Sequence, residues 1–275
     1  MKQLLFLKLL RYRKTKVIWT VHNIEPHEGG TRDSRDYFES ILRNVDGVIF
    51  MDNTSRERAI KEFNGFKDKP FSIVPHGNYR GLYRNEISKS DARRSLGISV
   101  DEKVILLFGK LSPYKGVEDF IRVFKSFSEK RVNLVIAGKP VNEDYLGAIK
   151  SLSQIDSRIH CFFGHVSDND VQLYMKAADL VVLPYLRSFT SGAVLLALSF
   201  NRPVLAVNVG FMNEVFQKVG AAWVKIYNPP LGADELGVAL KWSMSGVRPK
   251  ITDLEMYGWG DISKKTLDFY KKILK

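Results

Sequence analysis

Short apolar runs alternate with amphipathic stretches along most of the chain, and the pattern is clearest in the second half. Apolar runs of this kind are typical of strands buried on both faces of a parallel sheet, and the intervening stretches have the spacing of covering helices. We therefore predict an α/β fold with a doubly wound parallel sheet. The predicted strands are residues 103–108, 132–137, 159–163, 180–183 and 204–207, and the predicted helices are residues 117–128, 143–152, 168–177, 192–200 and 232–244.

The first 80 residues repeat this alternation in a shorter series. The alternation stops in the charged, glycine-containing stretch of residues 76–100, where we place a domain boundary. The prediction is two Rossmann-like domains, residues 1–80 and 81–255, followed by residues 256–275 with an amphipathic terminal helix. In the first domain the predicted strands are residues 16–21, 47–51 and 71–75, and the predicted helices are residues 37–45 and 56–63.

The first domain is predicted to be incomplete. A nucleotide-binding fold of this kind normally opens with a strand and a glycine-rich turn, but here a helix-like stretch precedes residue 16. Either the chain is truncated or another polypeptide completes the sheet, because the edge of the sheet would otherwise lie open.

Loops that leave the carboxyl ends of the predicted strands are the expected ligand sites of an open parallel sheet. The loop before the apolar helix at residues 192–200 contains Ser188, Thr190, Ser191 and Gly192. Bare backbone N–H groups at a helix N-terminus favour an anion such as phosphate. The alternative is that Ser191 only caps the helix.

A second loop, residues 109–116, contains two lysines and follows the first predicted strand of its domain. Lys110 and Lys115 would lie at the carboxyl edge of the sheet, near the N-terminus of the next helix. Two ammonium groups and a helix dipole form a strong site for a diphosphate, although surface lysines of a basic protein need no such role. Because both loops would converge on one crevice, we favour the diphosphate site.

The charge balance adds an anionic partner to this picture. A net charge of +12 and a pI near 9.6 suit a phosphorylated small molecule, an anionic membrane surface or nucleic acid. No zinc-finger spacing, basic zipper or RNA-binding aromatic signature occurs, so we predict no nucleic-acid partner. The single cysteine, Cys161, excludes an internal disulfide and fits a reducing compartment, and no metal-ligand pattern is found.

Residues 1–16 form a leucine-rich segment with six Lys or Arg residues and no acidic residue. The segment lacks a small-residue cleavage site, so no signal peptide is predicted, and no apolar stretch is long enough to span a bilayer. Two interpretations are open: an amphipathic helix on anionic lipid, or a helix packed on the core with a basic outer edge. The predicted location is cytoplasmic, with the inner face of the membrane as an alternative.

Several stretches, in this order, resemble the donor-binding half of the family 4 glycosyltransferases, which have the two-domain GT-B fold. The resemblance covers residues 74–224 and rests on FGKLSPYKGVEDFIRVF, LVIAGKP, CFFGHVSDNDVQLYMKAADLVVLPY and SGAVLLALSFNRPVLAVNVGFMNEV. TVHNIEPHE at 20–28 and IVPHG at 73–77 further resemble a branch found among bacterial exopolysaccharide and capsule enzymes. The stretch from Trp259 onward is similar to the helix that crosses back to the first domain in this fold.

The resemblance implies a role for each motif. Lys110 and Lys115 would neutralise the diphosphate of a nucleotide sugar while the glycosidic bond breaks, and His22 would approach the donor sugar from the first domain. A different explanation of His22 is a strand-end histidine that is satisfied locally. The remaining implied donor contacts are Gly164, His165 and Val166 at the nucleobase and Thr190, Ser191 and Gly192 at the phosphate.

One departure from the family pattern concerns recognition of the sugar and ribose. The family commonly has two glutamates around the phosphate loop, and here Ser188 and Leu196 stand at those positions. Glu214 follows Gly210 in the next loop, as in the family, and it is either a further donor contact or a helix cap.

The predicted function is transfer of a hexose from a nucleoside diphosphate sugar to a saccharide or polyprenyl-linked acceptor, with retention and without a metal or other cofactor. The first alternative is an inactive or partial homologue that serves as the donor-binding subunit of a split enzyme. The short first domain and the absent glutamate pair favour that alternative, whereas the lysines and His22 oppose it. The second alternative, a nucleic-acid binder, rests on charge alone.

Overall fold

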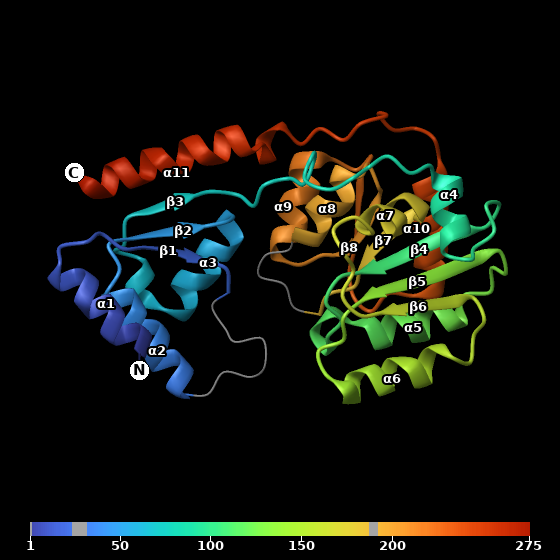
Figure 1. Ribbon diagram of the computed structural model, residues 1–275, viewed down its shortest axis with the longest axis horizontal. Helices are drawn as coiled ribbons and strands as arrows, with labels where there is room; N and C mark the ends of the chain where they lie inside the picture. The colour runs from blue at the N-terminus through green and yellow to red at the C-terminus, as the bar shows by residue number, and fades with distance from the viewer. Residues whose placement is uncertain (1, 24–31, 187–191) are drawn as a thin grey trace. The chain divides into compact units, whose positions relative to one another are not determined.

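The protein, as a computed structural model that describes residues 2–23, 32–186 and 192–275, consists of two compact units (Figure 1). The first unit comprises residues 1–77 and 255–275, and the second comprises residues 78–254. The chain therefore leaves the first unit after Gly77 and returns to it at Glu255.

The first unit is built on a parallel sheet whose described strands lie in the order β1-β2-β3. Ile18 pairs with Gly47, and Val48 pairs with Phe71, so the three predicted strands are confirmed. The helix predicted at residues 37–45 begins earlier, at Arg32. The elements of this unit are α1 (Lys2–Tyr12), β1 (Ile18–Val21), α2 (Arg32–Arg43), β2 (Gly47–Phe50), α3 (Asn53–Glu62), η1 (Asn64–Phe66), β3 (Phe71–Ile73), η3 (Glu255–Tyr257) and α11 (Trp259–Leu274).

The terminal helix α11 packs on the sheet of the first unit. Its apolar residues Ile262, Phe269 and Ile273 form a buried cluster with Ile49 of β2. A Cβ atom at Gly47 would lie 2.9 Å from the side chains of Phe269 and Ile273, so glycine at this position lets the helix approach β2 closely.

The second unit is a six-stranded parallel sheet among the described residues, with the strand order β6-β5-β4-β7-β8-β9. This is the order of a doubly wound Rossmann sheet, and its topological switch point lies between β4 and β7. The elements are α4 (Lys89–Ser95), β4 (Lys103–Phe108), η2 (Pro113–Lys115), α5 (Val117–Ser126), β5 (Val132–Gly138), α6 (Glu143–Ser153), β6 (Ile159–Phe163), α7 (Val171–Ala177), β7 (Leu180–Leu183), α8 (Gly192–Ser199), β8 (Val204–Val207), α9 (Gly210–Val219), β9 (Val224–Tyr227) and α10 (Ala233–Met244).

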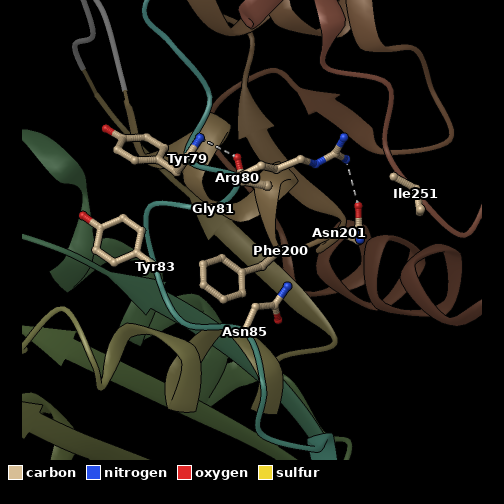
Figure 2. A pocket seen from close by; sticks show the side chains of 9 residues that line it. Tyr79, Arg80, Gly81, Tyr83, Asn85, Phe200, Asn201 and Ile251 are labelled. Carbon is tan, nitrogen blue, oxygen red and sulfur yellow. Dashed lines mark hydrogen bonds between the residues drawn. The ribbon is translucent and has the colours of Figure 1, made fainter. Parts of the chain in front are cut away.

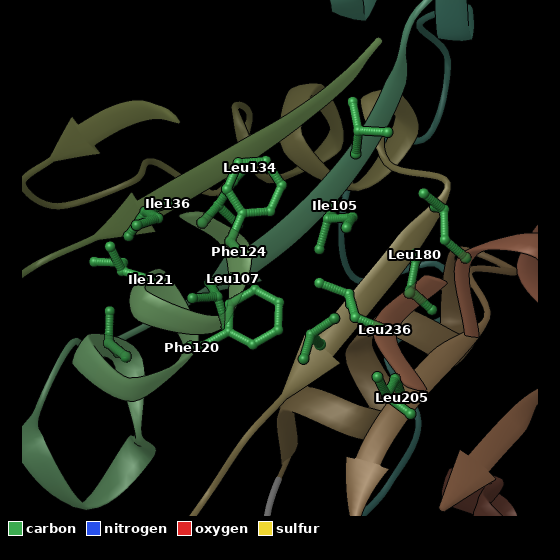
Figure 3. Close-up of a cluster of buried hydrophobic side chains, with 14 of the residues drawn as sticks. Ile105, Leu107, Phe120, Ile121, Phe124, Leu134, Ile136, Leu180, Leu205 and Leu236 are labelled. Atoms are coloured by element: carbon green, nitrogen blue, oxygen red, sulfur yellow. The ribbon is translucent and has the colours of Figure 1, made fainter. Parts of the chain in front are cut away.

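The core of the second unit lies between one face of the sheet and helices α5, α6 and α10 (Figure 3). Phe120 and Phe124 are four residues apart, hence on one side of α5, and both are buried with Leu107 and Ile136 of the sheet. Helices α7 and α8 contact the sheet on its other face. The apolar runs of the sequence are thus explained by burial of the central strands on both sides.

A buried ion pair joins α4 to the amino ends of two central strands. Asp179, just before β7, accepts hydrogen bonds from Arg93 at 2.6 Å and from the backbone N–H of Val104 at 2.8 Å, and it also pairs with Lys89. The side chains of Arg93 and Asp179 are 6% and 8% exposed. Helix α4 is not among the predicted helices, because it is polar and has no apolar periodicity; the long-range contact with Asp179 stabilises it.

Two further elements differ from the sequence prediction. Residues 208–213, where no helix is predicted, are mostly helical, because α9 begins at Gly210. Strand β9 was not predicted, and it extends the sheet beyond β8 through the pairing of Val204 with Val224. In the part of the chain that the structure describes, every helix is too short or too polar to cross a membrane.

Candidate functional site

Three adjacent strands of the second unit end in a glycine with positive φ. Gly109 after β4, Gly138 at the end of β5 and Gly164 after β6 have φ values of 108°, 145° and 128°. The N–H of Gly109 donates to the carbonyl of Ala137 at 3.0 Å, and that of Gly164 donates to Gly138 at 3.1 Å. A Cβ at Gly138 would lie 1.9 Å from the carbonyl oxygen of Gly109, so the two backbones meet closely only because residue 138 is a glycine.

The lysine loop turns back over the carboxyl end of β4. The 3₁₀ helix η2 places Lys115 next to Gly116, whose left-handed conformation (φ 65°, ψ 25°) lets α5 begin at Val117. A Cβ at Gly109 would lie 3.6 Å from the Lys115 ammonium. Lys115 therefore folds back over the strand end, as the sequence predicts, whereas the side chain of Lys110 is exposed.

The loop after β7 meets the lysine loop at the switch point. The N–H of Leu186 donates to the carbonyl of Tyr114 at 2.8 Å. A Cβ at Gly116 would lie 2.2 Å from the carbonyl oxygen of Pro184, so these backbones are in direct contact. Ser188, Thr190 and Ser191 lie outside the described residues, and their approach to Lys115 stays a prediction.

The environment of Lys115 is unfavourable for its charge. Burial, and secondly the nearby ammonium of Lys110, lowers the pKa of Lys115 to about 8. Its ammonium lies 5.2 Å from the centroid of the Tyr185 ring, which provides a cation–π contact. An incoming anion would relieve both the desolvation and the repulsion between the two lysines. Tyr185 was missed by sequence reasoning, and the only signal for it is its place two residues after the end of β7.

The loop after β6 provides the other side of the carboxyl edge. Gly164 lies two strands away from Gly109, or about 10 Å at ordinary strand spacing. A Cβ at Gly164 would have no neighbour within 4 Å, His165 is exposed and Val166 is half-buried. The three residues predicted to contact a nucleobase therefore lie together at the carboxyl edge of the sheet, where a ligand can reach them.

Helix α8 begins at Gly192 and is apolar on nearly all sides. Leu196, at one of the positions where the resembled family has a glutamate, is 8% exposed and packed in the core, so no carboxylate is offered there. Glu214 lies within α9, past its N-cap residue Val209, and forms an ion pair with Lys218 at 3.6 Å. Glu214 is therefore not the helix cap considered above.

His22 belongs to the first unit. It directly follows β1 at the carboxyl end of the strand, and its side chain is exposed. Its neighbours Pro26, His27 and Glu28 in the motif lie outside the described residues. The approach of His22 to a donor sugar stays a prediction.

A separate cavity of about 290 Å³ lies at the opposite end of α8 (Figure 2). Tyr79, whose N–H donates to Ser199 at 2.9 Å, and Arg80, which donates to Asn201 at 3.2 Å, hold the chain around it. None of the predicted site residues lines this cavity. Within the described ranges, no group of three or more His, Cys, Asp or Glu side chains could hold a metal ion.

The fold and the site define the second unit as a Rossmann-type α/β unit that has a lysine, Lys115, at its topological switch point. The sequence pattern of the family described as "Glycosyl transferases group 1" matches residues 88–236. This match spans more than half of the chain, and the chain belongs to that family of transferases.

Curated relatives agree with this assignment. The GDP-mannose:glycolipid 4-beta-D-mannosyltransferase of Xanthomonas campestris pv. campestris is 30% identical over 261 residues, which are 94% of this chain and 69% of that protein. An uncharacterized glycosyltransferase of Methanocaldococcus jannaschii is 30% identical over 235 residues, covering 82% of this chain and 59% of its own length. The exopolysaccharide branch stays a prediction.

Solved structures with the same fold confirm the predicted architecture. Anabaena HepE, solved in complex with UDP-glucose, has a TM-score of 0.75 at 16% identity and covers 99% of this chain and 75% of its own. Sucrose-phosphate synthase from Thermosynechococcus elongatus has a TM-score of 0.72 at 17% identity and covers 96% of this chain and 70% of its own. These proteins have the GT-B fold, so the predicted α/β fold with parallel sheets of the GT-B type is confirmed.

Proposed function

We propose that this chain moves a hexose from a nucleoside diphosphate sugar to a saccharide or lipid-linked acceptor. The observation that carries the proposal is the convergence of the Lys115 loop and the Pro184–Leu186 segment at the switch point of the second unit. The Xanthomonas relative, named for GDP-mannose and a glycolipid, supports a donor and an acceptor of these classes.

Electrostatic stabilisation of the leaving group is the main catalytic contribution in this proposal. As the glycosidic bond breaks, negative charge develops on the diphosphate, and the ammonium groups of Lys115 and Lys110 offset it. The low pKa of Lys115 suits this role, because its charge is only weakly satisfied before the diphosphate arrives. Backbone N–H groups around Thr190, Ser191 and Gly192 would share the phosphate, with Ser188 and Glu214 beside the donor and His22 near its sugar.

The proposal requires no metal ion or cofactor. Two lysines and the N-terminus of α8 supply the positive charge that a divalent cation supplies in other transferases. The expected readout is donor binding that does not change when a chelator is added.

Donor affinity is expected to fall as pH rises above about 8, by up to about tenfold per pH unit. Bound diphosphate raises the pKa of Lys115, because the anion stabilises the ammonium. The protonated form therefore binds more tightly, and the gain in affinity is complete below the pKa of the free protein and lost above it. Calorimetry with a nucleotide sugar from neutral pH upward measures this, and a flat profile contradicts it. The donor affinity of Lys115→Met should not fall with pH over this range.

A second candidate is a donor-binding subunit without turnover of its own. The observation that favours it is the buried Leu196 in an apolar helix, where the family commonly has a carboxylate. A partner polypeptide that completes the first unit would then supply the missing catalytic parts.

Calorimetry against UDP, GDP, ADP and CDP and their hexose derivatives tests the proposal. Binding of one base class with a matching sugar derivative is expected, and failure of every nucleoside diphosphate to bind contradicts the proposal. Release of the diphosphate in the presence of lipid-linked saccharides separates the two candidates, because a binding subunit shows affinity without release.

A further inference from the structure

The cavity at the C-terminal end of α8 has the size of a small-molecule site. Its volume of about 290 Å³ lies at the lower limit of the range typical for ligand pockets. Its lining comes from three parts of the second unit that are far apart in the sequence: residues between 79 and 85, residues 199–201, and Ile251. The cavity is therefore a product of the tertiary fold and not of one loop.

Hydrogen bonds hold these three parts of the chain together. The N–H of Tyr79 donates to the hydroxyl of Ser199 at 2.9 Å. The side-chain oxygen of Asn201 accepts from Arg80 at 3.2 Å and from the N–H of Thr252 at 3.0 Å. The walls are thus fixed before a ligand arrives, and a preformed site avoids much of the cost of ordering side chains on binding.

Aromatic rings line one side of the cavity. The ring centroids of Tyr79 and Tyr83 are 5.8 Å apart, and the buried Phe200 lies next to them in the lining. Figure 2 shows the three rings on the side of the cavity away from Ile251. The planes of the two tyrosines are tilted by 39°, so they do not form a parallel slot for a flat base. They instead offer a surface on which the apolar face of a ligand can pack.

The polar groups of the lining suit a neutral ligand that carries hydroxyl groups. Asn85 is exposed and Asn201 is half-buried, and a side-chain amide both donates and accepts hydrogen bonds. The guanidinium of Arg80 is already engaged, because it donates to Asn201 and to the carbonyl oxygen of Thr252. None of the described lining residues is acidic, so a cationic ligand would find no counter-charge there.

We infer that this cavity binds one hexopyranose unit of a saccharide. A pyranose ring has a face of C–H groups, which would pack on Tyr83, and a rim of hydroxyls, which the amides of Asn85 and Asn201 would bind. A nucleotide fits less well, because its phosphate would have to compete with Asn201 and Thr252 for Arg80.

The inference rests on the proposed function only in preferring a saccharide to other neutral polar molecules. It goes beyond that function because the cavity is separate from the carboxyl edge of the sheet, where the donor is proposed to bind. A sugar unit held here does not react; it retains the saccharide to which it belongs. The recognised chemistry is the pyranose ring itself, so a simple methyl glycoside is a sufficient probe.

Titration of the isotope-labelled full chain with methyl pyranosides of glucose, mannose and galactose tests the inference by NMR. At millimolar concentrations, at least one of these sugars should shift the side-chain amide signals of Asn85 and Asn201. Tyr83→Ala should weaken this binding about tenfold and Asn85→Ala about fivefold, because each loses one contact with the ring or its hydroxyls. Tyr83→Phe keeps the ring and should bind like the unchanged protein.

Tyr270→Ala and Asn169→Ala are matched controls, because both residues are exposed and lie outside the lining. Both should bind the sugar with unchanged affinity. The inference is overturned if none of the sugars shifts the two amide signals, or if Tyr83→Ala and Asn85→Ala both bind like the controls.

Competition with nucleotides separates this site from the donor site. Displacement of the sugar by a nucleoside diphosphate would place the sugar at the donor site, and this result also overturns the inference. Uridine or guanosine that shifts the two amide signals where no sugar does would assign the cavity to a base instead. Lys115→Met should bind the sugar normally, so failure of the donor site leaves this test unaffected.

Discussion

Lys115→Met is expected to weaken binding of the nucleoside diphosphate about 100-fold and to slow transfer by a further factor of about 10²–10³. The affinity loss follows from removal of a half-buried cation, whose charge-assisted contacts to phosphate the exposed Lys110 would replace only weakly. The further loss in rate follows because charge on the leaving diphosphate is larger in the transition state than in the bound donor. Calorimetry and donor turnover measure the two effects separately.

Two lysine variants serve as controls for this prediction. Lys110→Met removes an exposed ammonium of the same loop, which water screens, and it should lower affinity by less than tenfold. Lys130→Met removes an exposed ammonium after α5 and should change nothing beyond the net charge. If Lys115→Met binds the donor like Lys130→Met, the diphosphate does not lie at the switch point, and the proposed function loses its main support.

The strands of the second unit could be predicted because burial on both faces leaves an unbroken apolar run. Residues 180–183 and 204–207 are strands β7 and β8 with the predicted bounds, and each of their residues is buried. Strand β9 escapes this criterion because it lies at the edge of the sheet, where Lys225 interrupts the run and most side chains are only half-buried. The pattern therefore reports burial rather than strand formation itself.

Helix α4 shows what local sequence cannot supply. Its seven residues, KSDARRS, have no apolar period, and their stability comes from Arg93, which reaches Asp179 86 positions along the chain. The partner of a buried charge is a property of the folded topology, and no spacing rule within residues 76–100 points to it. The division between the two compact units falls in this stretch of the sequence, between Gly77 and Asn78, and α4 follows it.

The candidate site was predictable to the extent that topology alone determines it. Parallel strands direct all their carboxyl ends to one edge, so the loops after β4 and β7 had to approach each other once both strands were recognised. The hydrogen bond from Leu186 to Tyr114 joins the start of the loop after β7 to the lysine loop, and the approach of Ser188, Thr190 and Ser191 stays a prediction. The ring of Tyr185 beside Lys115 and the backbone contact of Gly116 with Pro184 depend on side-chain and backbone packing, which the order of strands does not specify.

Gly116→Ala is expected to lower the free energy of unfolding by about 3 kcal/mol and to weaken donor binding at least about tenfold. Part of the cost is the left-handed backbone, at φ 65°, which disfavours any Cβ. The rest arises because the new Cβ would lie 2.2 Å from the Pro184 carbonyl oxygen, so the two loops must move apart. Urea unfolding and calorimetry with the donor measure the two results.

Gly97→Ala is the control, because it introduces the same backbone strain without a steric contact. Gly97 has a similar φ of 70°, but no atom lies within 4 Å of the position that a Cβ would take. This substitution should lower the free energy of unfolding by about 1–2 kcal/mol, which is the cost of the left-handed backbone alone, and leave donor affinity unchanged. The difference between the two variants therefore measures how firmly the loop after β7 is held against the lysine loop. If both variants lose the same stability and both keep full affinity, the contact of Gly116 with Pro184 does not position the donor site, and convergence of the loops is a feature of packing alone.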